Sequence, residues 1–157
     1  MMSNQDNELT RVYGAGWKFP LTFDLQGPST DQDINERSAV VMSTGADNVA
    51  QSLGILFQTQ PGERIMRASY GCDMQSMVFE NVSEGTLASL HSRISESVAR
   101  YEPRAEGVTI DMQEDPQQAG SLRITVTYRL AGQTQQVSGT LNLLDGAGGG
   151  WDSWATL

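Results

Sequence analysis

The sequence predicts an α+β fold, with a mixed, mainly antiparallel sheet and two main helices packed on it. Two segments carry apolar residues at helical spacing, one ending before Pro61 and one running from Ser83 to Tyr101. Two later segments, Val108–Gln113 and Leu122–Leu130, alternate apolar and polar residues, which is typical of a sheet with one face in water.

The length and charge of the chain limit its organisation and its ligands. Its 157 residues fit one domain, which we expect over 13–144, between a flexible N-terminal arm (1–12) and a Gly-rich linker with a Trp-containing tail (145–157). The net charge of -9 argues against nucleic acid, because phosphate binding needs clustered cationic side chains. The sequence shows neither a secretory signal nor an apolar run of membrane-spanning length, so we expect cytoplasmic assembly without membrane insertion.

The first third of the chain predicts a loop and two short strands. Two glycines beside two aromatic residues in Tyr13–Trp17 indicate an anchored loop, and the alternation over Leu21–Leu25 indicates a strand. A polar, acidic loop, Gly27–Ser38, precedes the short apolar run Ala39–Met42, which we expect to be a second strand.

The first helix is expected to begin at Thr44, whose hydroxyl can accept from the first amides, with Asp47 favouring the positive helix end. Its apolar face consists of Val49, Leu53, Leu56 and Phe57. Pro61 cannot continue the helix, and Pro61 with Gly62 suits a type II turn. After this turn we expect a strand over Glu63–Ser69.

The second helix is expected to begin at Ser83 and Glu84 and to end near Tyr101, because Pro103 disfavours helical geometry at the residue before it. Its apolar stripe is Leu87, Leu90, Ile94, Val98 and Tyr101. Three strands then follow over Val108–Gln113, Leu122–Leu130 and Gln133–Leu143.

The end of the chain predicts a sheet edge and a separate tail. The strand from Gln133 is largely polar, which fits an edge position. Gly146–Gly150 is a spacer of small residues, and it leads to Trp151 and Trp154, which would be costly to leave in water. The tail either folds back on its own domain or docks on a partner, and we favour the partner.

No combination of side chains in the sequence indicates catalysis. A glycoside hydrolase needs two carboxylates at a set separation. The acids around the helix-turn join are Glu63, Asp73, Glu80 and Glu84, and none is diagnostic. His91 is the only histidine and Cys72 the only cysteine, so a zinc site and an intrachain disulfide are both unsupported. We therefore expect no cofactor, no metal and no small-molecule substrate.

Six short segments together carry a resemblance to a known family. They are Gly16–Pro20, Gln51–Leu56, Thr59–Arg64, Tyr70–Cys72, Phe79–Glu80 and Glu102–Arg104. In this order and at these spacings, the chain resembles the baseplate-wedge, or sheath-initiator, family of contractile injection systems. That family occurs in contractile-tailed phages, R-type pyocins, phage tail-like particles and type VI secretion systems, and it is often labelled lysozyme-like.

The resemblance implies a fold similar to the core domain of contractile sheath subunits and a structural, non-enzymatic role within a baseplate. The chain would link the wedge and the hub to the first sheath ring and would template sheath assembly. Its partners would be the sheath protein of the first ring, baseplate wedge proteins, and hub, spike or tube-initiator proteins. A peptidoglycan hydrolase and a generic soluble α+β adaptor remain as alternatives.

The resemblance also assigns roles to two motifs. Glu102, Pro103 and Arg104 would bind the wedge scaffold, the alternative being a local salt bridge at the helix end. Pro61, Gly62, Glu63 and Arg64 would form a structural turn.

Two further contact sites are expected near the C-terminus. The edge strand would pair with an extended arm of the sheath protein by strand addition, the alternative being a solvated edge. Its contact residues would be Gln133, Gln135, Val137 and Gly139. Trp151 and Trp154 would dock the tail on a neighbouring subunit.

Overall fold

The computed structural model describes residues 4–25, 38–78, 80–144 and 151–156. It divides into two compact units, residues 1–51 and 52–157, whereas we expected one domain over 13–144. The division falls inside a helix, where no linker composition is expected. Most of the acidic loop Gly27–Ser38 and the whole spacer Gly146–Gly150 lie outside the described residues.

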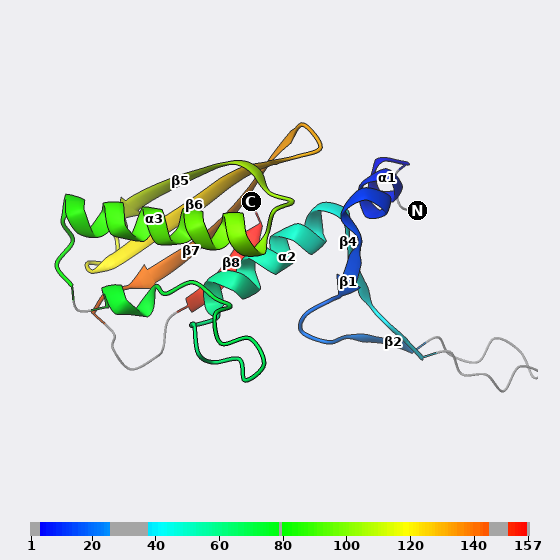
Figure 1. Ribbon diagram of the computed structural model, residues 1–157, viewed down its shortest axis with the longest axis horizontal. Coiled ribbons are helices and arrows are strands. Elements are labelled where there is room, and N and C mark those ends of the chain that lie inside the picture. Colours follow the sequence, from blue (N-terminus) through cyan, green and yellow to red (C-terminus); the bar gives the residue numbers. More distant parts are fainter. Residues whose placement is uncertain (1–3, 26–37, 79, 145–150, 157) are drawn as a thin grey trace, which may run out of the picture. The chain divides into compact units, whose positions relative to one another are not determined.

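The described part of the first unit contains a short helix, the beginning of a second one and two small antiparallel sheets (Figure 1). The short helix is α1 (Asn4–Tyr13). β1 (Ala15–Trp17) pairs with β4 (Met42–Thr44), and β2 (Phe23–Leu25) pairs with β3 (Ser38–Val40). The expected strands near Leu21–Leu25 and Ala39–Met42 are therefore present. The expected loop over Tyr13–Trp17 is instead the end of α1 followed by β1.

Helix α1 covers most of the segment 1–12 that we expected to be a flexible arm. The helix ends at Gly14, which has a φ of 81° and whose amide donates to the Thr10 carbonyl at 2.9 Å. A glycine with positive φ just after the last turn satisfies helix-end carbonyls, and Arg11 lies in that turn where the helix dipole favours a cation. The small number of apolar side chains in this segment led to the expectation of flexibility, although Gly14 marks a helix end.

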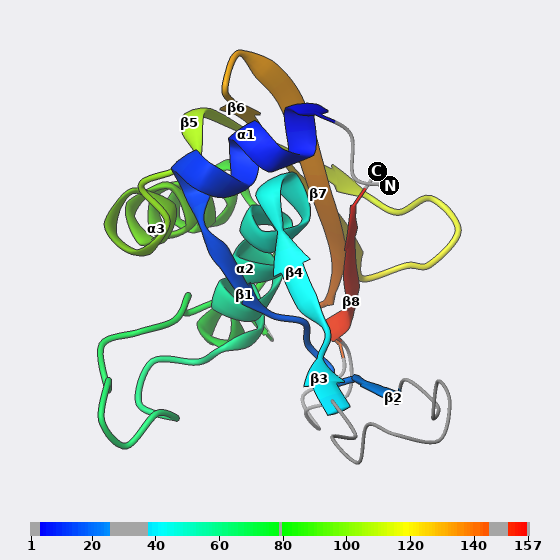
Figure 2. The ribbon, with the colours of Figure 1, turned by 90° about the vertical axis from the view of Figure 1, so that its right-hand side faces the viewer.

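The second unit is built on a four-stranded sheet in the order β5-β6-β7-β8, with every neighbouring pair antiparallel. The strands are β5 (Glu106–Glu114), β6 (Ser121–Leu130), β7 (Gln133–Asn142) and β8 (Trp151–Thr156). α3 (Glu84–Tyr101) lies across one face of this sheet, as does the part of α2 (Gly45–Gln58) that belongs to this unit (Figures 1 and 2). The short 3-10 helix η1 (Gln75–Met77) lies between the two helices in sequence. The predicted α+β class is thus confirmed.

The apolar residues of the second unit meet between the helices and the sheet. The expected helix faces are buried at Leu53, Leu56, Phe57, Leu90, Ile94 and Val98. The sheet contributes Leu122, Ile124, Val126, Tyr128, Val137 and Leu141. α3 begins where predicted, since the Ser83 hydroxyl accepts from the Thr86 amide at 3.2 Å.

Strand β8 corrects two expectations about the C-terminus. It pairs with β7 from Val137 opposite Thr156 to Leu141 opposite Trp151, so this stretch of β7 is not a sheet edge. The backbone around Trp151 and Trp154 therefore folds back on its own sheet, which is the alternative that we disfavoured. The prediction failed because it weighed the polar side chains of β7, whereas a strand is added through backbone groups. In the described pairings, β8 does not reach the first four residues of β7, Gln133 to Gln136, which pair with β6 alone.

None of the helices in the described part of the chain has the length and apolar character needed to cross a bilayer.

Candidate partner-binding site

The segment between α2 and α3 forms a closed loop that projects from the second unit (Figures 1 and 2). Its ends meet where the Cys72 amide donates to the Thr59 carbonyl at 2.9 Å. Higher in the loop, the Gly62 amide donates to the Ala68 carbonyl at 2.8 Å. We call residues 59–72 the projecting loop.

The strand expected over Glu63–Ser69 is not formed, and this prediction is wrong. The Arg67 amide donates to the Arg64 carbonyl at 3.1 Å, and the Tyr70 amide donates to the Arg67 carbonyl at 3.0 Å. These bonds join residues three apart, so the backbone turns repeatedly instead of extending. The alternation in the sequence could not show that the backbone groups of this segment bond locally.

The turn at the start of the projecting loop is the one that the sequence predicts. Gly62 has a φ of 97°, and the Glu63 amide donates to the Gln60 carbonyl at 3.1 Å, as a type II turn requires. The Glu63 carboxylate reaches back to accept from the Gln60 amide at 3.0 Å. Glu63 therefore stabilises the turn.

Gly71 allows the two ends of the loop to approach closely. Its φ is 130°, and a Cβ added there would lie 2.3 Å from the Thr59 carbonyl oxygen. No side chain fits at that distance, so the close approach of the two backbone segments requires glycine.

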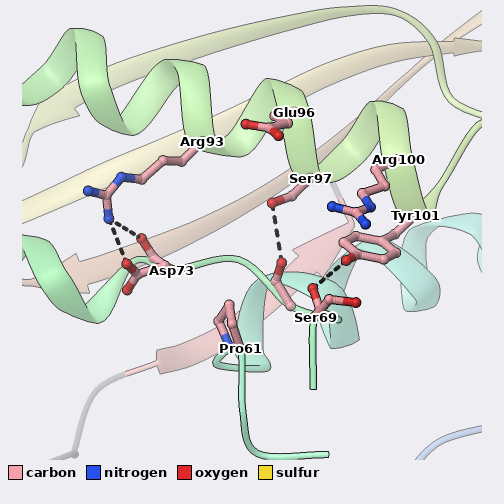
Figure 3. Close-up of a pocket in the computed structure, with 9 residues that line it drawn as sticks. Pro61, Ser69, Asp73, Arg93, Glu96, Ser97, Arg100 and Tyr101 are labelled. Atoms are coloured by element: carbon pink, nitrogen blue, oxygen red, sulfur yellow. Dashed lines mark hydrogen bonds and ion pairs between the residues drawn. The ribbon is translucent and has the colours of Figure 1, made fainter. Parts of the chain in front are cut away.

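Two tyrosines connect the projecting loop to the end of α3. The Tyr70 and Tyr101 rings meet edge to face with centroids 5.1 Å apart, and the Arg64 guanidinium lies 4.2 Å from the Tyr70 centroid. The Tyr101 hydroxyl donates to the Ser69 carbonyl, as Figure 3 shows. Burial of Tyr70 raises the pKa of its hydroxyl, although the Arg64 charge opposes this change.

Asp73 anchors the other side of the loop to α3. Its carboxylate accepts from the Gln60 side chain at 2.7 Å and from the Ser76 amide at 3.2 Å. It also pairs with Arg93 at 2.7 Å, as Figure 3 shows. Partial burial raises the pKa of Asp73, but the hydrogen bonds from Gln60 and Ser76 and the Arg93 charge outweigh this and lower it. The carboxylate is thus held in its ionised form.

A small pocket of about 190 Å³ lies between the projecting loop and α3 (Figure 3). Its lining comprises Pro61, Ser69, Gly71, Asp73, Arg93, Glu96, Ser97, Arg100 and Tyr101. Of the four acids considered for a hydrolase, Asp73 alone lines this pocket; Glu63, Glu80 and Glu84 do not. The lowered pKa of Asp73 is opposite to what a general acid needs.

The Glu102–Arg104 motif closes on itself at the end of α3. Arg104 Nε donates to Glu102 Oε1 at 2.5 Å, and a terminal guanidinium nitrogen donates to Oε2 at 2.6 Å. The Glu102 side chain is 2 % exposed and that of Arg104 is 30 % exposed. The hydrogen bond with Glu102 raises the pKa of Arg104. The structure therefore contains the local salt bridge that we considered as the alternative, and it leaves Pro103 and the outer part of Arg104 facing solvent.

The remaining candidate residues are structural or simply exposed. Cys72 is buried, and burial raises the pKa of its thiol to about 11. His91 lies on the exposed face of α3. Within the residues described, no group of three or more His, Cys, Asp and Glu side chains is arranged to hold a metal ion.

Sequence reasoning missed the tip of the projecting loop. Ile65 is 96 % exposed and Met66 is 93 % exposed, whereas the predicted strand would have buried one of them. The available signal was the pair of arginines, Arg64 and Arg67, on either side of the two apolar residues.

Comparison with known proteins gives consistent matches. The family model for baseplate wedge protein gp25 matches residues 43–135, which is more than half of the 157 residues. Baseplate wedge protein gp25 of Enterobacteria phage T4 is 29% identical over 85 residues, which cover 54% of this chain and 63% of that protein. The chain thus spans less than two thirds of the length of this curated relative.

Two solved structures have similar folds. A chain from the cryo-EM structure of the anti-feeding prophage baseplate has a TM-score of 0.67 and 42% identity, with 79% of this chain and 90% of that chain covered. A putative tail lysozyme from Geobacter sulfurreducens has a TM-score of 0.62 and 27% identity, with 69% of this chain and 100% of that chain covered.

The chain therefore belongs to the family of baseplate wedge protein gp25, which confirms the resemblance to the baseplate-wedge family of contractile injection systems.

Proposed function

We propose that the chain is a non-enzymatic connector in the baseplate, linking wedge and hub proteins to the first sheath ring and templating sheath assembly. The observation that carries this proposal is the 42% identity to a chain of the anti-feeding prophage baseplate, over 90% of that chain. At this identity and coverage, we expect this chain to present the same surfaces to its partners as that baseplate chain does. Assembly would take place in the cytoplasm, with the chain retained in the finished baseplate.

The sheath contact would use strand addition at the β8 side of the sheet. The described order β5-β6-β7-β8 places β8 at one end, so its outer backbone groups take the place of the edge that we expected on β7. Backbone hydrogen bonds to an added strand supply affinity, and alternate side chains supply register. The stretch of β7 before Val137, which includes Gln133 and Gln135, would extend this contact beyond the end of β8.

The wedge contact would use the outer surface of the Glu102–Arg104 motif. Because the Glu102 carboxylate is buried against Arg104, a partner would meet Pro103 and the exposed part of the guanidinium. Glu102 then acts by fixing the direction of Arg104, and a fixed guanidinium loses less entropy when it binds a partner.

Peptidoglycan hydrolysis is the second candidate function, since one solved structure with a similar fold is that of a putative tail lysozyme. Three acids considered for this reaction have other structural settings: Glu63 supports a turn, Asp73 is paired with Arg93, and Glu84 lies in the first turn of α3. We expect purified protein to leave the turbidity of a peptidoglycan suspension unchanged. Clearing of the suspension that is lost in Asp73→Asn would support the hydrolase instead.

Co-purification from the organism that encodes the chain tests the connector role. Tagged wild-type protein should recover sheath and wedge proteins, and the double variant Glu102→Ala, Arg104→Ala should lose the wedge proteins. The matched control is Asp115→Ala, Arg123→Ala, which removes an ion pair of the same charge in which Arg123 is 60% exposed. Thermal unfolding of all three proteins separates a lost contact from a lost fold. Recovery of a monomer without these proteins would contradict the proposal.

A further inference from the structure

The tip of the projecting loop exposes two adjacent apolar side chains almost completely. Ile65 and Met66 are 96 % and 93 % exposed, and the next most exposed large apolar residue described is Val12 at 74 %. Single exposed apolar residues are common on protein surfaces and carry no message. Two neighbours at the end of a projection are more informative, because a small convex apolar tip can enter a concave site on another protein.

The base of the projecting loop is rigid. The Gly62–Ala68 and Cys72–Thr59 hydrogen bonds close it at two levels, and the contact of Tyr101 with Tyr70 connects it to α3. At Gly71 the two backbone segments approach so closely that a Cβ would not fit. A tip held in this way loses little conformational freedom on binding, so a small contact area can still give useful affinity.

The charge around the tip is opposite to the charge of the chain as a whole. Arg64 and Arg67 flank Ile65 and Met66, while the complete chain has a net charge of -9. In the described part of the chain, the ion pairs involve Arg93, Arg104 and Arg123, so neither arginine of the tip is neutralised by a carboxylate. The adjacent acid, Glu63, is turned back toward the Gln60 amide. The complementary surface is therefore acidic.

We propose that Ile65 and Met66 insert into an apolar socket with an acidic rim on a neighbouring baseplate protein, with Arg67 facing that rim and Arg64, which packs on Tyr70, adding to the positive charge of the loop. This inference rests on the proposed function, since it places the partner in the same assembly. The apolar pair supplies the buried contact, and the arginines orient the approach and exclude sockets with a basic rim.

A lipid surface is a poorer match to the same tip. Two side chains bury little area in a bilayer, and a chain with a net charge of -9 is repelled by the anionic lipids that arginines would seek. A second copy of the chain is a further possible occupant. Both are outcomes that the experiment distinguishes.

Photo-cross-linking in cells that assemble the particle identifies the occupant directly. A benzophenone amino acid is placed at position 65 or 66 of the full chain, and the control position is His91, which is exposed on α3. We expect positions 65 and 66, but not 91, to cross-link to one baseplate protein, within a peptide that contains apolar residues beside Asp or Glu. Cross-links to lipid, to a second copy, or to the same products as position 91 would overturn the proposal.

Substitution of the tip measures its contribution to assembly. Ile65→Ser with Met66→Ser, and separately Arg67→Glu, should lower incorporation into purified particles by about tenfold, as loss of a central contact does. The conservative control, Ile65→Leu with Met66→Leu, should retain incorporation. Because these side chains are exposed, the unfolding temperatures should remain equal.

The two proposals fail in different ways. If wild-type protein is absent from particles, the connector role fails. If the wild type and all tip variants are incorporated equally, only the inference about the tip fails.

Discussion

The Arg104 guanidinium holds both carboxylate oxygens of Glu102, two residues earlier, at 2.5 and 2.6 Å. The Glu102 side chain is 2 % exposed, so the carboxylate of this pair is buried. Pro103 between them is exposed and has a restricted backbone. The motif is therefore a rigid corner at the end of α3, and its effects on stability and on binding must be measured separately.

Removal of Arg104 should destabilise the protein. Arg104→Ala leaves the buried Glu102 carboxylate without its cation, and we expect the free energy of unfolding to fall by about 3 kcal/mol. Glu102→Gln with Arg104→Met removes both charges and should cost less, because no charge remains buried. Urea unfolding at pH 7 measures both. Equal losses for the two variants would mean that packing, and not the buried charge, determines the effect.

Asp73 should make stability depend on pH in the acid range. Its pKa in the folded protein lies below the ordinary 3.8, so its contribution is fully present above the unfolded pKa and is lost as the pH falls through the folded pKa. Asp73→Asn should therefore cost about 1 kcal/mol at pH 7 and progressively less below about pH 4. Urea unfolding of both proteins from pH 2 to 7 tests this. A difference that is constant with pH would contradict the assignment.

Gly71 and Gly62 should respond differently to alanine. At Gly71 the new Cβ meets the Thr59 carbonyl at 2.3 Å, whereas at Gly62 no atom lies within 4 Å and only the positive φ is unfavourable. We expect Gly62→Ala to cost about 1 kcal/mol and Gly71→Ala at least about 2 kcal/mol. Thermal unfolding ranks the two. The reverse order would mean that the loop ends are not held as described.

Cys72 should react slowly in the native protein. Its side chain is 1% exposed and its pKa is raised to about 11, so at pH 8 about one thiol in a thousand is ionised. Iodoacetamide should label it readily only after unfolding in urea. Ser92→Cys on the exposed face of α3 supplies a reactive control within the same protein. Equal labelling rates for the two native thiols would contradict the burial of Cys72.

Strand β8 should protect the backbone of β7. Deletion of residues 145–157 removes the partner that pairs with Val137 to Leu141, and we expect the β7 amides that face β8 to exchange hydrogen faster. Amides that face β6 should change less. Hydrogen exchange followed by mass spectrometry compares the two peptide sets. Unchanged exchange in β7 would mean that the C-terminal segment does not complete the sheet in solution.

The regular elements of the second unit were predictable because their signals are local and repeated. Ser83 at the start of α3, its buried stripe through Leu90 and Val98, and the strict alternation in β6 all follow from short-range rules. The turn at Pro61–Gly62 was equally local. These predictions needed no knowledge of which elements meet in space.

The errors concern long-range contacts. Whether Glu63–Ser69 extends or turns depends on a neighbouring strand, and none pairs with it in the described structure. The place of Trp151–Thr156 depends on which backbone captures it, which side-chain polarity does not indicate. The burial of Glu102 and the exposure of Ile65 likewise depend on the surrounding fold. For the same reason the sequence predicted the turn at Pro61–Gly62 but not the exposed tip at Ile65 and Met66.

Quantitative mass spectrometry of purified particles tests whether the chain connects the wedge to the sheath. The gene is deleted, tagged wild-type chain is supplied in its place, and particles are compared with sheath-free baseplates from the same cells. If the chain connects the wedge to the sheath, it should be present at a fixed ratio to wedge proteins in both preparations. When the chain is withheld, neither sheath-bound baseplates nor particles should form. Particles that assemble normally without the chain, or wild-type particles that lack it, would contradict the connector role.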